Sequence, residues 1–167
     1  TIDPCTLIIF GAAGNLSRLK LIPSLFRLEM ANRLPEHIAI IGCSIEPRQR
    51  EEWVAEVVKI LEPVYPQGID KPALERFCAR MHYHAIPPGD DAAYQRLKQT
   101  LEENRNFPPN MVFYMSVSPA AFPEIVDKLG SVKLLEQEHG WRRVVIEKPF
   151  GYDLLSAQTL QGSLYKH

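Results

Sequence analysis

The chain has 167 residues, of which 46% are hydrophobic and 23% are charged, so it is long enough to bury one sizeable core. With 19 basic and 20 acidic side chains its formal net charge is -1, which argues against a general nucleic-acid-binding surface. The three cysteines, Cys5, Cys43 and Cys78, are odd in number and lack C-x-x-C spacing, so we expect no disulfide framework, no zinc site and a reducing cytoplasm.

The first element along the chain is a short strand. Residues 6–10 (TLIIF) form a continuous apolar run with β-branched members, which predicts a strand that is buried on both faces. No apolar run in the sequence reaches the roughly 18 residues that a membrane span needs, and no basic region precedes this run as in a signal peptide. We therefore expect no membrane partner.

The first helix follows a turn that contains two glycines. Its apolar residues recur at three- and four-residue steps and predict a stripe that faces the sheet: Leu16, Leu19, Ile22, Leu25, Phe26 and Met30. Pro23 lies inside this pattern and either kinks the helix or marks a late first turn. A second buried strand is expected over residues 38–42, and a second helix then opens at Glu46-Pro47.

The alternation continues after a proline-rich interruption. We expect a loop over residues 63–72, a short helix at about 73–80 and a weak strand at about 82–86. Residues 87–89 (PPG) then break the chain. The break marks the passage to the second half of the fold.

The second half adds two helices and two strands. Asp90 or Asp91 can cap a helix, after which residues 111–116 read as a strand, residues 119–129 as a helix and residues 144–146 as the last clear strand. About five strands alternating with helices predict an α/β fold with a doubly wound, mostly parallel sheet and helices on both faces.

The sharpest local signal is GAAGNLS, residues 11–17, between the first strand and the first helix. Glycine permits a tight turn, and the free N–H groups and positive dipole end of a helix offer a site for a pyrophosphate. The spacing is G-x-x-G-x-x-S rather than G-x-G-x-x-G, so a simple turn is the alternative. The strand-turn-helix context favours nucleotide binding.

Lys148 is the second signal, because it comes directly after the last strand. Ligands of open α/β sheets bind outside the carboxyl ends of the strands, so a functional lysine is expected at such a position. The alternative is a solvated surface charge. Pro149 and Gly151 favour function, since both restrict or shape the backbone that aims the side chain.

Two other residue pairs have simpler interpretations. His82 and His84 alternate on a predicted strand and therefore point the same way, but no third ligand is evident. We expect them to lie on a solvent-facing or core-edge face of the strand and to bind no metal. Trp53 and Trp141 are expected to pack in the core.

Two longer stretches, GAAGNLSRLKLIPSLFRL and EKPFGYDLLSAQ, resemble the two signature stretches of the coenzyme domain of glucose-6-phosphate dehydrogenases. The segments IIGCSI, DDAAYQRL and FYMSVSP lie between them in the expected order, so the resemblance covers essentially the whole chain. It implies a Rossmann-like NAD(P)-binding domain over residues 1–167. It also implies that NADP, with NAD as a possible substitute, accepts a hydride from glucose 6-phosphate, which becomes 6-phosphogluconolactone.

The resemblance further implies roles for individual residues. It assigns coenzyme binding to Gly11, Ala12, Ala13, Gly14, Asn15, Leu16, Lys20, Ser44 and Lys148. Lys148 also matches the family lysine that reaches the sugar phosphate near the nicotinamide. No metal ligand and no catalytic base of this chain is implied.

One departure from the family pattern concerns the choice of coenzyme. Ile45 stands where the family commonly has an arginine that clamps the 2′-phosphate of NADP. Glu46 could instead accept a hydrogen bond from a free ribose 2′-hydroxyl, whereas Arg48 or Arg50 could restore a phosphate clamp. The preference between NADP and NAD is therefore open.

A second departure concerns the remainder of the family pattern. A RIDHYLGK-type segment and a distant histidine base follow in the family, and His167 lacks the motif of that base. We expect that a C-terminal catalytic domain is absent, that the chain alone is an inactive monomer and that the full-length enzyme is a homo-oligomer. The alternatives are a complete NAD(P)-sensing module or another sugar oxidoreductase with an E-K-P motif, which residues 153–157 (DLLSA) disfavour.

Overall fold

A computed structural model describes residues 3–104, 106–137 and 140–146. Its five strands form one parallel sheet in the order β3-β2-β1-β4-β5. The strands are β1 (Cys5–Phe10), β2 (Ile38–Ser44), β3 (Met81–Ala85), β4 (Met111–Met115) and β5 (Arg142–Ile146). The helices are α1 (Ile22–Met30), α2 (Arg50–Leu61), α3 (Lys71–Ala79), α4 (Ala92–Glu103) and α5 (Phe122–Ser131), with short turns η1 (Ser17–Leu21), η2 (Glu62–Val64) and η3 (Pro119–Ala121).

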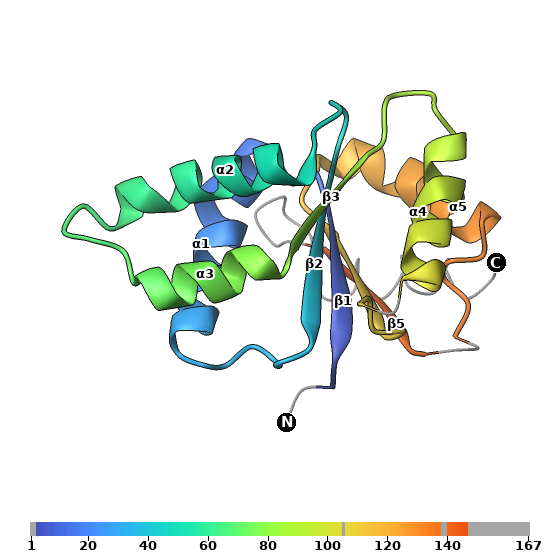
Figure 1. Ribbon diagram of the computed structural model, residues 1–167. Helices are drawn as coiled ribbons and strands as arrows, with labels where there is room; N and C mark the ends of the chain where they lie inside the picture. The colour runs from blue at the N-terminus through green and yellow to red at the C-terminus, as the bar shows by residue number, and fades with distance from the viewer. Residues whose placement is uncertain (1–2, 105, 138–139, 147–167) are drawn as a thin grey trace.

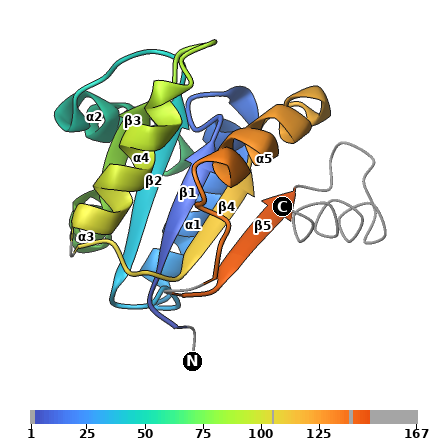
Figure 2. The same cartoon turned by 90° about the vertical axis from the view of Figure 1, so that its right-hand side faces the viewer.

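The sheet lies between two layers of helices (Figures 1 and 2). Helices α1, α2 and α3 cover one face, where Leu7 and Ile9 of β1 are buried, and α4 and α5 cover the other, where Ile8 and Phe10 are buried. Side chains of a strand alternate between faces, so a strand buried on both faces reads as one apolar run. The prediction of a doubly wound α/β fold with helices on both faces is confirmed.

The strand order reverses between β1 and β4. The chain moves outward from β1 to β2 and β3, then crosses the sheet through α4 and returns to place β4 on the other side of β1. The crossovers therefore leave β1 and β4 toward opposite faces, and they open a crevice outside the carboxyl ends of these strands. The registers Phe10 with Cys43 and Phe10 with Met115 bring the ends of β2, β1 and β4 to one edge.

The first helix begins later than the hydrophobic pattern indicates. Residues Ser17–Leu21 form a π-helical turn, and α1 proper starts at Ile22 with Pro23 in its first turn, which agrees with the late-turn alternative. The wider turn takes Leu19 off the predicted apolar stripe, and 76% of this residue is exposed. Its placement on the buried stripe was therefore wrong.

Helices α2 and α3 also differ from the predicted bounds. Helix α2 starts at Arg50 and not at Glu46, because Gln49 is extended and forms a reciprocal capping box with Glu52. Helix α3 starts at Lys71, inside the predicted loop, because the Asp70 carboxylate accepts a hydrogen bond from the N–H of Ala73. Capping chemistry, rather than the proline pattern, sets both starts.

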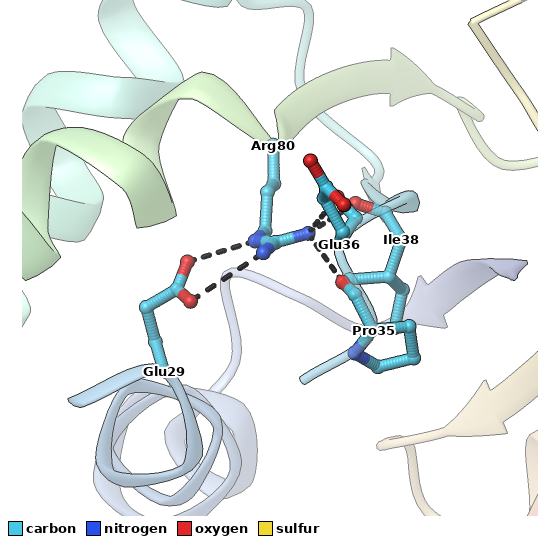
Figure 3. A network of polar contacts seen from close by, with 5 residues as sticks. All are labelled: Glu29, Pro35, Glu36, Ile38 and Arg80. Carbon is cyan, nitrogen blue, oxygen red and sulfur yellow. Dashed lines mark hydrogen bonds and ion pairs between the residues drawn. The ribbon is translucent and has the colours of Figure 1, made fainter. Parts of the chain in front are cut away.

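A largely buried arginine, whose side chain is 13% exposed, ties the amino-terminal ends of β2 and β3 to the first helix layer. Figure 3 shows Arg80, at the end of α3, directed between Glu29 of α1 and the loop that enters β2. Its Nε donates to Glu29 Oε1 at 2.8 Å, and its Nη1 donates to the carbonyls of Pro35, Glu36 and Ile38 at 2.9 to 3.1 Å. The guanidinium thus joins three segments that are far apart in sequence.

Three smaller findings complete the fold. Cys5, Cys43 and Cys78 are free thiols. Within the described ranges, no helix has the length and apolar character that crossing a membrane requires. Trp53 is 1% exposed and lies in the core, whereas Trp141 is only half-buried and lies under the Arg143 guanidinium, 4.2 Å from its ring centre, so its predicted core position was wrong.

Candidate functional site

The glycine turn lies at the carboxyl end of β1, at the point where the strand order reverses. Gly11 has φ +79°, and a Cβ at this position would lie 2.3 Å from the carbonyl oxygen of Ser116 and 2.7 Å from Val117 Cγ1. A side chain here would therefore separate β1 from the segment that follows β4. Glycine lets the two strand ends approach closely and keeps the crevice open in front of them.

The backbone amides of this turn fall into two groups. Gly11 and Ala12 both donate to the carbonyl of Cys43, at 3.0 and 3.1 Å, and Gly14 donates to the carbonyl of Gly11 at 2.9 Å. The first two amides hold the turn against β2, and the third closes the turn on itself. Helical backbone then begins at Asn15, and the first N–H groups of a helix have no acceptor inside it.

The amides that the turn leaves available to a ligand are thus fewer than the predicted set. Asn15 is exposed, and Ala13 and Leu16 are half-buried. Gly14 is exposed and a Cβ there would meet only the carbonyl of Gly11, at 3.2 Å. The helix start combines unpaired N–H groups with the positive end of the helix dipole, which suits a diphosphate.

Two buried serine hydroxyls flank the same region. Ser17 is 0% exposed and Ser116 is 4% exposed, and neither Oγ has a hydrogen-bond partner in the described part of the chain. The N–H of Ser116 donates to the carbonyl of Phe10 at 2.9 Å, which holds the residue against the end of β1. Sequence reasoning did not single out Ser116, although its place directly after a strand was the available signal.

A cavity of about 270 Å³ extends from the glycine turn across the ends of the first four strands. Its wall is made by four separate segments: Phe10 and Gly11; Cys43, Ser44 and Ile45; Ile86 to Asp91 with Tyr94; and Val117, Ala121, Glu124 and Ile125. Most of these side chains are apolar, which suits the flat ring of an aromatic base. Burial raises the pKa of Tyr94 to about 12, so its phenol is neutral there.

Charged groups at the cavity are acidic. Asp90, Asp91 and Glu124 line it, and none of its described lining residues is basic. Arg96 approaches Asp90 at 2.8 Å, and its hydrogen bond lowers the pKa of that carboxyl. Lys128 approaches Asp91 at 2.8 Å.

The loop between β2 and α2 forms one side of the cavity mouth. Ser44 and Ile45 line the cavity, and Ile45 is 58% exposed. The side chain of Glu46 is 73% exposed, whereas that of Arg48 is only 15% exposed. Arg50 donates to the backbone carbonyls of Met81 and Cys78, at 2.8 and 3.0 Å. Both arginines that could have restored a phosphate clamp are therefore engaged with the protein.

Two further predicted site residues and the two predicted sheet histidines remain to be placed. Lys20 is exposed on η1, beside the turn, and Lys148 lies outside the described residues. The His82 ring packs edge-on against Phe107 with centroids 4.8 Å apart, and Nε2 of His84 lies 2.9 Å from the carbonyl oxygen of Ala93. Among described residues, no cluster of histidine, cysteine, aspartate or glutamate side chains is arranged to hold a metal.

Several known proteins that are similar to this chain belong to one enzyme family. The family model of the glucose-6-phosphate dehydrogenase NAD binding domain matches residues 8–167. The glucose-6-phosphate 1-dehydrogenases of Aggregatibacter actinomycetemcomitans and Chlamydia pneumoniae are 31% and 35% identical over 98% and 96% of this chain, and the match spans 33% of each relative.

Two solved structures extend this agreement to the fold. A glucose-6-phosphate dehydrogenase in complex with its substrate glucose-6-phosphate has a TM-score of 0.78 and 34% identity, covering 98% of this chain and 34% of that one. The Mycobacterium avium glucose-6-phosphate 1-dehydrogenase has a TM-score of 0.76 and 27% identity, with the same coverage. The chain thus spans about a third of the length of these relatives. It belongs to the family of glucose-6-phosphate dehydrogenase NAD binding domains.

Proposed function

We propose that this chain is the coenzyme-binding part of an NADP-dependent glucose-6-phosphate dehydrogenase, with NAD as an alternative coenzyme. The observation that carries the proposal is the cavity at the strand-order reversal, which Gly11 lines with positive φ and after which the first helix begins at Asn15. Open α/β sheets bind dinucleotides at this place. The coenzyme would supply the hydride acceptor for the oxidation of glucose 6-phosphate to 6-phosphogluconolactone.

The residues present fit a dinucleotide in two parts. The amides of Ala13, Asn15 and Leu16 would hold the pyrophosphate, while Gly11, Ala12 and Gly14 shape the turn that presents them. Ser44 and the apolar cavity wall would hold the adenosine end. Lys20 lies beside the turn and is exposed, so it can add a positive charge near the phosphates or the substrate.

The sugar phosphate would be bound by Lys148, which follows β5 in the sequence. Hydride transfer from C1 of the sugar also needs a base on the C1 hydroxyl, and the family resemblance places no such base in this chain. We therefore propose that the chain alone does not oxidise glucose 6-phosphate. In the full-length enzyme, which we propose to be a cytoplasmic homo-oligomer, the rest of the polypeptide completes the site.

Calorimetric titration of the chain with NADP and with NAD tests coenzyme binding. Gly14→Val is the informative variant, because its exposed position spares the core while a branched side chain blocks approach to the helix start. We expect the variant to keep its thermal unfolding transition and to bind both coenzymes at least tenfold more weakly. A tenfold loss corresponds to about 1.4 kcal/mol of binding free energy. A folded Gly14→Val chain that binds both as well as the parent would place the site elsewhere.

A further inference from the structure

A polar cluster that the proposed function does not use lies beside the cavity. We define the arginine clamp as Glu46, Arg48, Glu56 and Tyr83. The Nε of Arg48 forms an ion pair with Glu56 Oε2 from helix α2. Its Nη1 donates to the Tyr83 hydroxyl of β3 at 2.7 Å, and that hydroxyl donates to the backbone carbonyl of Glu46 at 2.6 Å.

The clamp holds Arg48 on the protein by three different contacts. Besides the ion pair and the hydrogen bond, the guanidinium lies over the Tyr83 ring, 5.3 Å from its centre. Its Nη2 is 3.8 Å from Glu46 Oε2, which is longer than a hydrogen bond. Arg48 thus lies on the same loop as Ile45 and Glu46, but its contacts with Glu56 and Tyr83 direct the guanidinium toward α2 and β3.

The charged groups around the cavity mouth also favour a hydroxyl over a phosphate. Glu46 presents an exposed carboxylate directly after Ile45, which lines the cavity. Asp90, Asp91 and Glu124 add carboxylates to the wall, of which Asp90 and Asp91 are paired with Arg96 and Lys128 outside it, and the described wall itself has no lysine, arginine or histidine. A carboxylate accepts a hydrogen bond from a ribose hydroxyl but repels a phosphate.

We propose that Glu56 is a positioning residue for coenzyme specificity: by holding Arg48 in the clamp, it keeps this cation off the 2′ position of the adenosine ribose. The site then lacks this cation's preference for a 2′-phosphate, so NAD becomes a usable coenzyme beside NADP. This inference rests on the proposed coenzyme binding. It adds that a 2′-phosphate site is latent in the loop and is released when Glu56 loses its charge.

The test is titration calorimetry of NAD and NADP with the chain and four variants. Glu56→Gln removes the ion pair, and Glu51→Gln is the matched control, because it removes the same charge from an exposed position on the same helix. Arg48→Gln and the double variant Arg48→Gln with Glu56→Gln complete a cycle. The readout is the ratio of the two dissociation constants, which a general loss of stability does not change.

The proposal predicts that Glu56→Gln binds NADP on the order of tenfold more tightly, as expected for one new charge-assisted hydrogen bond, while NAD binding stays nearly constant. Glu51→Gln should leave the ratio unchanged, and the double variant should lose the gain. Equal changes for both coenzymes in Glu56→Gln would overturn the proposal. So would a selective loss of NADP affinity in Arg48→Gln alone, which decides the matter even if Glu56→Gln fails to fold. Binding of neither coenzyme to the parent chain would instead overturn the proposed function, and the inference with it.

Discussion

At the residue scale, two glycines with nearly the same φ allow backbone strain to be measured separately from steric clash. Gly11 has φ +79° and a Cβ there would collide with Ser116, whereas Gly89 has φ +77° and open space around it. We expect Gly89→Ala to lower the free energy of unfolding by about 1–2 kcal/mol through backbone strain alone. Gly11→Ala should cost about 2–5 kcal/mol, because a clash of about 1–3 kcal/mol is added. Urea denaturation of both variants measures the difference, and equal losses would show that the close approach to Ser116 is unimportant.

Two half-buried histidines make stability depend on pH. Burial lowers the pKa of His82 and of His84 below the ordinary value of 6.5. The unfolded chain therefore takes up protons first as the pH falls, so both histidines favour the folded state above about pH 6.5 and this contribution is lost as the pH falls toward their folded pKa values.

We expect the free energy of unfolding, measured by urea denaturation, to fall as the pH is lowered through this range. His84→Gln should reduce the slope, because glutamine keeps an N–H for the carbonyl of Ala93 but does not titrate. His37→Gln is the control, since His37 is exposed. A slope that is unchanged in His84→Gln would mean that His84 is protonated as easily in the folded chain as in the unfolded one.

At the scale of elements, the Arg80 contact is expected to matter far more than a surface ion pair of similar length. Arg80 pairs with Glu29, whose side chain is 3% exposed, and Arg96 pairs with Asp90 at the surface, both at 2.8 Å. Arg80→Met leaves a buried carboxylate and three carbonyls without their donor, and we expect a loss of about 3–5 kcal/mol of unfolding free energy. Arg96→Met should cost at most about 1 kcal/mol. Similar losses of unfolding free energy in the two variants would show that water reaches the Glu29 carboxylate once Arg80 is removed.

The same elements show what sequence patterns can and cannot predict. Strands β1 and β2 were found because strands buried on both faces read as apolar runs, as in residues 6–10, whereas β3 is only partly buried and gave a weak pattern. Helix starts were missed where an uncommon cap decides them, as Gln49 does for α2, and where a π-helical turn changes the spacing, as at Leu19. The core position predicted for Trp141 was wrong because a large aromatic ring can be covered without entering the core. Here the Arg143 guanidinium covers the ring beside the edge strand β5.

At the scale of the whole molecule, the candidate site is predictable only in part. The turn at residues 11–17 is one continuous segment, so its place after a strand and before a helix could be read directly. The cavity is built from the ends of four strands, and the residues that form it, such as Tyr94 and Glu124, meet only after the chain crosses the sheet. The clamp on Arg48 was likewise hidden, because its partners Glu56 and Tyr83 come from α2 and β3.

The central claim is that a dinucleotide binds at the carboxyl ends of β1 and β4. The most direct measurement is a titration of the isotopically labelled chain with NADP and NAD, followed through its backbone amide NMR signals. We predict that the largest shifts occur at Ala13, Asn15 and Leu16, with further shifts at Ser44 and Val117 on the cavity wall. Shifts confined to the opposite end of the sheet, around the Arg80 contacts of residues 36–38, or no shifts at all with either coenzyme, would contradict the account.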